Sequence, residues 1–158
     1  MGVRQFTVIV LLLFFCVSTA YASALEEAIS AYKSGNFLTA KRIFSQLAPE
    51  GQAVAQRYLG EMYDKGQGGA QDYVQAVEWY KKAAKQNDST AQYHLAVKYA
   101  NGHGVPQDPK LAYAWFAIAF NNGYEKAAGA LRVLNKTLSM PERQQALQLA
   151  SKQLSELP

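Results

Sequence analysis

The sequence predicts an all-α protein, a right-handed α-solenoid of stacked helix–turn–helix units, on three observations. Residues 55–87 align with residues 91–123 at an offset of 36 without a gap, and 11 of the 33 positions are identical. About two identities would be expected from ordinary residue usage. The matched small and apolar residues recur at i, i+3/i+4 and i+7/i+8, which is the spacing of one helix face. Between the two helical patterns of each copy lies a glycine-containing stretch, "GQGGAQD" and "GHGVPQD".

The two copies resemble a known repeat. "AQRYLGEMYDKGQGGAQDYVQAVEWYKKAAKQN" and "AQYHLAVKYANGHGVPQDPKLAYAWFAIAFNNG" are similar to Sel-one-like repeats, which are 36-residue relatives of the tetratricopeptide repeat. Their pattern runs A-x-x-x-L-G-x-x-Y-x-x-G-x-G-V-x-x-D-x-x-x-A-x-x-W-Y-x-x-A-A-x-x-G. The chain departs from it at Gly69, Ala96 and Phe120. The resemblance implies a bacterial protein that binds other proteins.

The N-terminus has the pattern of a cleaved secretory signal over residues 1–22. It carries one positive charge at Arg4, an apolar stretch over residues 8–17 and small residues spaced for cleavage after Ala22. Cleavage after Ala24 is equally compatible with the pattern. An uncleaved membrane anchor is the alternative, but the apolar stretch is short for a span. We therefore expect a periplasmic or secreted protein with no stable membrane span after cleavage.

Composition excludes several classes of site. Cys16, the only cysteine, lies inside the expected signal, so the mature chain has no disulfide, no cysteine-bound metal and no cysteine nucleophile. Loss of Arg4 leaves 15 basic and 12 acidic residues, a net charge of +3. This surplus is too small and too scattered for a nucleic-acid footprint. We expect a monomer with no metal, no cofactor and no nucleic-acid partner.

The first structural unit is expected over residues 24–52. "AISAYKSGNFLTAKRIFSQLA" resembles a plain tetratricopeptide unit, with Tyr32, Gly35-Asn36-Phe37, Ala40 and Phe44 in place and a shorter loop.

The two full repeats are expected over residues 53–88 and 89–124. Gly66 and Gly102 fall where the first helix of each unit ends, and glycine adopts the left-handed conformation of a helix end most easily. Asp72 and Asp108 are predicted N-caps of the second helices.

Two further features of these repeats are predicted. Pro109 stands at the favoured first helical position, and Gln75 is placed for a capping box with Asp72. Trp79 and Trp115 occupy identical repeat positions, so we expect both in the core. Tyr93 lies outside the repeat pattern and is a candidate for contact with a ligand.

A partial repeat and a capping helix are expected over residues 125–158. Ala127 and Leu131 continue the register into one more helix. Ser139 and Glu142 form a predicted capping box for a final helix. Its inner stripe is predicted to contain Ala146, either Leu149 or Ala150, and Leu154, while its other side is polar.

No catalytic residue is predicted. His94 and His103 lie nine residues apart, one on a helix and one in a turn, which is neither a zinc-binding i, i+4 pair nor part of an evident triad. Glu26, Glu27 and Asp64 are interpreted as exposed helix carboxylates. The sequence therefore predicts a non-enzymatic scaffold or adaptor of the bacterial envelope. The alternative, implied by cysteine-rich relatives that bind or slowly hydrolyse penicillins, is a weak β-lactamase-like hydrolase or a binder of cell-wall fragments.

A binding groove follows from the tetratricopeptide resemblance, which implies that the first helix of each unit lines the concave face. Positions off the Leu/Tyr stripe of these helices then face a protein or peptide partner. The expected groove residues are Lys33, Arg57, Glu61, Asp64, Lys65, Tyr93, Val97 and Asn101.

Overall fold

The computed structural model describes residues 21–156. Except for its last two residues, the expected signal of residues 1–22 lies outside this part of the chain, as does Cys16. All regular structure within residues 21–156 is helical, as predicted. Across the same residues, no helix combines the length and the apolar character needed to cross a membrane.

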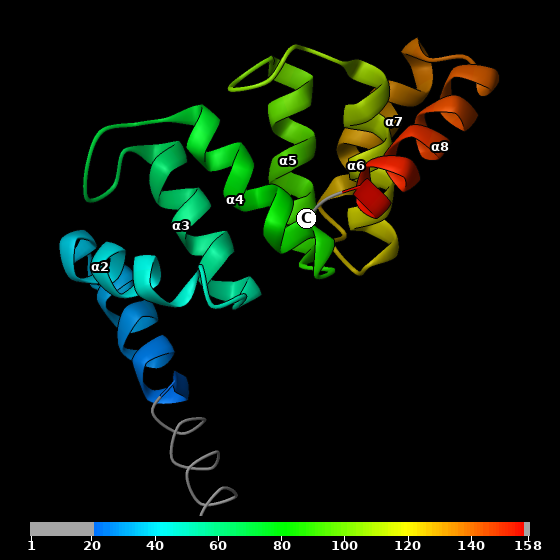
Figure 1. The fold of residues 1–158 in the computed structure, drawn as a ribbon. Helices are drawn as coiled ribbons and strands as arrows, with labels where there is room; N and C mark the ends of the chain where they lie inside the picture. The colour runs from blue at the N-terminus through cyan, green and yellow to red at the C-terminus, as the bar shows by residue number, and fades with distance from the viewer. Residues whose placement is uncertain (1–20, 157–158) are drawn as a thin grey trace, which may run out of the picture.

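The helices from α2 to α7 stack side by side in chain order to form an α-solenoid, and α8 returns to pack on α6 (Figure 1). Residues 21–33 are helical and precede the labelled elements. The labelled helices are α2 (Phe37–Leu47), α3 (Ala53–Lys65), α4 (Tyr73–Lys85), α5 (Ser89–Asn101), α6 (Pro109–Asn121), α7 (Ala127–Thr137) and α8 (Met140–Glu156).

Helix boundaries in the two repeats follow the predicted turn residues. Gly66 and Gly102 end α3 and α5 in the left-handed conformation, with φ of 67° and 71°. The carboxylate of Asp72 accepts a hydrogen bond from the backbone N–H of Gln75 at 3.0 Å. That of Asp108 accepts from two N–H groups at the start of α6. The repeated stretch is therefore the junction between two helices, as its sequence predicts.

The same stretch also contacts the preceding unit. Gly68 lies against the backbone of Phe37, and Gly104 lies against the backbone of Tyr73. Phe37 and Tyr73 are the first residues of α2 and α4. A β-carbon on Gly68 would lie 2.7 Å from the carbonyl oxygen of Phe37, and one on Gly104 would overlap the peptide group of Tyr73. The second glycine of each stretch is therefore required where two units meet.

Two apolar clusters form most of the core. One joins residues 24–32, α2 and α3, and the other joins α4, α5, α6 and the start of α7. Trp115 is buried in the second cluster, as predicted, whereas the prediction for Trp79 is met only in part. Trp79 lies half-buried at the edge of the first cluster, where the ammonium of Lys82 covers its ring at 4.2 Å. Tyr80, the next residue along α4, is fully buried.

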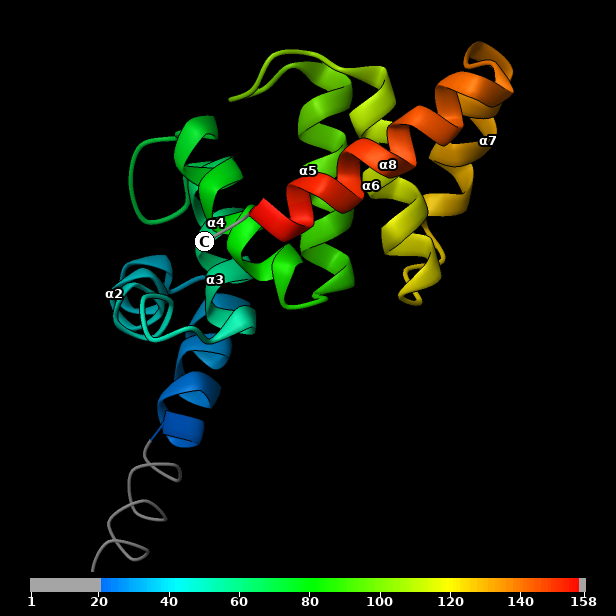
Figure 2. The same cartoon turned by 45° about the vertical axis from the view of Figure 1, so that its right-hand side comes forward.

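The last helix closes the array by packing on α6. It turns back after α7 and runs alongside α6, with Ala146 and Ala150 buried against Ala114 (Figure 2). Leu149 is 40% exposed, so Ala150 is the inner residue of the predicted pair. One half of the predicted capping box is present, because the carboxylate of Glu142 accepts a hydrogen bond from the backbone N–H of Ser139 at 2.8 Å, and the Ser139 hydroxyl donates to the same carboxylate at 2.8 Å. These bonds lower the pKa of Glu142.

Candidate binding surface

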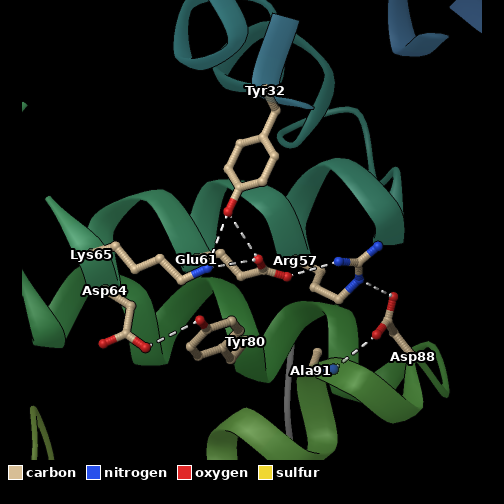
Figure 3. Close-up of polar contacts among 8 residues, drawn as sticks. All are labelled: Tyr32, Arg57, Glu61, Asp64, Lys65, Tyr80, Asp88 and Ala91. Atoms are coloured by element: carbon tan, nitrogen blue, oxygen red, sulfur yellow. Dashed lines mark hydrogen bonds and ion pairs between the residues drawn. The ribbon is translucent and has the colours of Figure 1, made fainter. Parts of the chain in front are cut away.

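A chain of charged side chains runs along α3 and connects it to both neighbouring units. Arg57, Glu61 and Lys65 stand at i, i+4 and i+8, so their side chains share one helix face. Tyr32 reaches this face from the preceding unit, and Asp88 reaches it from the start of α5 (Figure 3). We call these five residues the charged network.

Arg57 is the centre of the charged network. Its Nη1 lies 2.8 Å from Oε1 of Glu61, and its Nε lies 3.1 Å from Oδ2 of Asp88. Burial opposes the positive charge of the guanidinium, but the carboxylates of Asp88 and Glu61 outweigh it and raise the pKa of Arg57. The side chain of Arg57 is 17% exposed, which makes these ion pairs stronger than pairs on an open surface.

Asp88 serves two structural elements at once. Its Oδ1 accepts a hydrogen bond from the backbone N–H of Ala91 at 2.8 Å and so caps the N-terminus of α5. Its Oδ2 pairs with Arg57. One carboxylate therefore fixes the start of the second repeat to the first helix of the repeat before it.

The other end of the charged network is a contact among Tyr32, Glu61 and Lys65. The Tyr32 hydroxyl donates to Oε2 of Glu61 at 3.2 Å, and the Lys65 ammonium donates to Tyr32 at 3.1 Å. The pKa of Lys65 is raised, since these partners outweigh the effect of burial. The Lys65 side chain is 50% exposed, so this cation is held in place and remains open to solvent.

A second set of polar contacts joins the two repeats directly. Lys98 of α5 forms an ion pair with Asp64 of α3, and the Tyr80 hydroxyl donates to the same carboxylate at 3.4 Å. The Lys98 side chain is only 5% exposed and lies over the Tyr73 ring at 4.7 Å. Burial, with Asp64 beside it, raises the pKa of Tyr80. Asp64 is therefore not the exposed carboxylate that the sequence suggested.

Aromatic rings occupy the corresponding face of α5. Tyr93 contacts Tyr124 and Phe116, with ring centroids 4.7 and 5.3 Å apart. Val97, one turn further on, is half-buried against the same cluster. His94 stacks on Tyr80 at 5.2 Å, and burial lowers its pKa. The α5 part of the surface is therefore apolar where the α3 part is charged.

The structure divides the predicted groove residues into three groups. Arg57, Glu61 and Lys65 meet in the charged network, and Asp64 pairs with the second repeat. Tyr93 and Val97 belong to the aromatic cluster. Lys33 and Asn101 are exposed, and Lys33 lines a separate small hollow with Glu26, Ile29 and Ser30.

Sequence reasoning missed four residues that organise this surface, Tyr32, Tyr80, Asp88 and Lys98. Asp88 had a detectable signal, because it stands immediately before a helical pattern as an N-cap does. Tyr32 and Lys98 act across units, at separations of 29 and 34 residues, and Tyr80 reaches Asp64 on the other helix of its own unit, 16 residues away. Their partners depend on how the helices pack.

The two histidines both rest on tyrosine rings. His103 stacks on Tyr73 at 4.7 Å in the exposed turn, and His94 stacks on Tyr80. Across residues 21–156, no group of three or more His, Cys, Asp and Glu side chains is placed to hold a metal ion.

Comparison with known proteins places the two repeats. Residues 53–88 and 89–128 match the family model described as Sel1 repeat. None of the curated proteins matches the chain.

Solved structures share the fold. A protective antigen present in uropathogenic Escherichia coli strains, which displays an SLR fold, aligns with a TM-score of 0.78 and 28% identity over 87% of this chain and 30% of its own. A Sel1 repeat protein from Oxalobacter formigenes aligns with a TM-score of 0.65 and 30% identity over 70% of this chain and 47% of its own. The Helicobacter pylori cysteine-rich protein B aligns with a TM-score of 0.57 and 23% identity, over 71% and 95% of the two chains. This chain spans less than half the length of the first two.

Proposed function

This chain carries two Sel1 repeats in an SLR-type solenoid, and from that premise we propose that it is a non-catalytic adaptor that holds another protein or a peptide. Sel1-repeat proteins are in general scaffolds for protein–protein interaction, and generally non-catalytic ones. The binding surface of the proposal is the face of α3 and α5 described above.

The observation that carries the proposal is the fixed position of one half-exposed charge on this face. Lys65 is held by Tyr32 and Glu61 yet is half open to solvent. Side chains that are already ordered lose little conformational freedom when a partner binds, so more of the contact energy becomes affinity. The neighbouring Tyr93 adds a half-buried aromatic residue, a type enriched at protein interfaces.

Site-specific photocrosslinking tests the surface. A photoreactive residue at Asn101 replaces an exposed side chain of α5 in the predicted groove, and one at Glu78 replaces an exposed side chain of a second helix. We expect discrete adducts in cells from Asn101 and none from Glu78. Adducts from Glu78 alone would place the partner on the second helices and contradict the proposal.

The partner is proposed to be met outside the cytoplasm. The signal-like pattern of residues 1–22 supports export to the periplasm or beyond, and the similar structures come from bacteria. Mass spectrometry of the envelope fraction should find a mature N-terminus at Ser23 or Leu25. A purified protein that retains Cys16 would contradict export with cleavage.

The hydrolase alternative gains no support from residues 21–156. Its most direct candidate bases, His94 and His103, are stacked on tyrosine rings. Incubation of the purified protein with a chromogenic β-lactam should give no turnover above a heat-inactivated sample.

A further inference from the structure

An open hollow of about 620 Å³ lies where the connection between α2 and α3 meets the C-terminal end of α4. Its volume is within the range of sites that hold small molecules. It shares no residue with the charged network. The lining residues are Ala48, Pro49, Gly51, Gln56, Lys82, Lys85 and Gln86.

The electrostatics of the hollow favour a negative ligand. Its seven described lining residues include two lysines and no carboxylate. Glu50, the acidic residue nearest in the chain, lines a different hollow with Tyr21 and Leu47. The ammonium of Lys82 is positioned by its contact with Trp79 at 4.2 Å, so this cation has a defined place at the site.

Amide groups form the polar part of the lining. Gln56 donates to the carbonyl oxygen of Ala48 at 3.0 Å, and Gln86 donates to Oε1 of Gln56 at 2.8 Å. An amide nitrogen carries two hydrogens, so Gln86 has a second one to offer a ligand. Ala48 and Pro49 add an apolar side.

The second repeat shows which of these features belong to the scaffold. There, Gln92 donates to the carbonyl oxygen of Ala84 and Asn122 donates to Gln92, which reproduces the amide arrangement. The positions that correspond to Lys82 and Lys85 are Ile118 and Asn121. The amides are therefore common to both repeats, whereas the two cations are particular to the first.

We propose that this hollow binds a small organic anion. Its anionic head, a carboxylate or a phosphate, lies against the ammonium group of Lys82, on the side of the hollow that Lys85 also lines, and its body contacts the amide of Gln86 and the apolar side formed by Ala48 and Pro49. This site is independent of the proposed protein-binding face, and either can fail without the other.

Titrations followed by amide NMR test the site, with three ligands added to the purified chain. These are N-acetyl-dialanine with a free carboxylate, the same compound as its C-terminal amide, and glycerol phosphate. We expect at least one anion to shift the side-chain amides of Gln56 and Gln86 and the backbone amide of Gly51. The neutral amide should leave them unchanged. The anion that binds at the lower concentration identifies the head group.

Three substitutions with the same change of charge locate the site. Lys82→Gln should weaken binding about tenfold, the loss of one hydrogen bond to a charged group, and Lys85→Gln, which removes the second lining cation, should weaken it by a smaller factor. Lys81→Gln, on the same helix but outside the hollow and paired with Glu78, should change affinity less than about twofold. Equal weakening by Lys81→Gln, equal binding of the neutral amide, or no shift with either anion at about 10 mM would overturn the proposal.

Discussion

Asp88 shows how one residue connects secondary structure to stacking, because it caps α5 and also pairs with Arg57. Asp88→Ala should remove both contacts. Loss of a cap costs about 0.5–2 kcal/mol, and loss of the partner of a half-buried cation adds about 1 kcal/mol or more. Urea denaturation should therefore show a larger loss for Asp88→Ala than for Asp72→Ala, which removes a cap alone.

Asp88→Asn separates the two contributions. The amide oxygen of asparagine still accepts the hydrogen bond from Ala91 but no longer carries the charge that Arg57 faces. Its loss of stability should lie between zero and that of Asp88→Ala. Equal losses for Asp72→Ala and Asp88→Ala would show that the ion pair adds nothing.

His94 should make stability depend on pH. Burial lowers its pKa in the folded state below the ordinary value of 6.5, so the unfolded chain binds a proton more readily. The contribution of His94 to stability is therefore complete above about pH 6.5 and is lost as the pH falls through its folded pKa.

His94→Phe tests this dependence, because it keeps an aromatic ring against Tyr80 and removes the titrating group. Melting temperatures measured between pH 7.5 and pH 5 should fall less in the variant than in the unsubstituted protein. Parallel curves for the two proteins would contradict the assignment.

At the scale of one helix–turn–helix element, replacing the turn glycine that contacts the preceding unit should cause a measurable loss of stability. Gly104→Ala places a methyl group against the backbone of Tyr73 and imposes a left-handed φ of 78° on alanine. Strain and overpacking together should cost about 2–4 kcal/mol. Thermal and urea unfolding measure this loss.

Gly51→Ala is the matched control. Gly51 has a similar φ of 88°, but no atom lies within 4 Å of an added β-carbon, so only the backbone term applies. We expect a loss of about 1 kcal/mol. If the two variants lost the same stability, the contact of Gly104 with Tyr73 would have no energetic role.

The elements themselves could be predicted from sequence because their signals are local. Each signal acts within a few residues of its own position: the helix ends at Gly66 and Gly102, the N-caps at Asp72 and Asp108, and the pair Ser139–Glu142. Gly68 and Gly104 have a second requirement for glycine that is not local, because it arises from the backbone of the preceding unit.

At the scale of the whole molecule, the α3–α5 face was predicted as a set of positions but not as a set of contacts. The repeat register placed Arg57, Glu61 and Lys65 on one face. It did not show that Lys98 is buried beside Asp64, because that pair spans 34 residues and depends on the angle between two units.

The two apolar clusters predict that damage to one unit stays largely local. Leu59 and Leu95 occupy equivalent positions and are both buried, but in different clusters. Either change to alanine should cost about 2–5 kcal/mol. In a solenoid the units couple mainly to their neighbours, so Leu59→Ala should increase hydrogen exchange in α2 and α3 more than in α6, and Leu95→Ala should do the reverse.

Hydrogen-exchange mass spectrometry of both variants, at a urea concentration well below the midpoint, checks this pattern. An equal increase along the whole chain in both variants would show that the array unfolds as a single cooperative body.

The contact of each turn glycine with the preceding helix also restricts how such a chain can change in length. Gly68 contacts Phe37, and Gly104 contacts Tyr73. Each full repeat therefore has a turn glycine that contacts the preceding unit, and the first repeat also has a helix start, at Tyr73, that the glycine of the next repeat contacts. A duplication or deletion of 36 residues, or of a multiple of 36, keeps every such junction intact, whereas a change of another length between a turn glycine and the helix it contacts breaks one. Lineages of this protein should therefore gain and lose length in whole repeats, and hybrid arrays assembled at the same junction should fold.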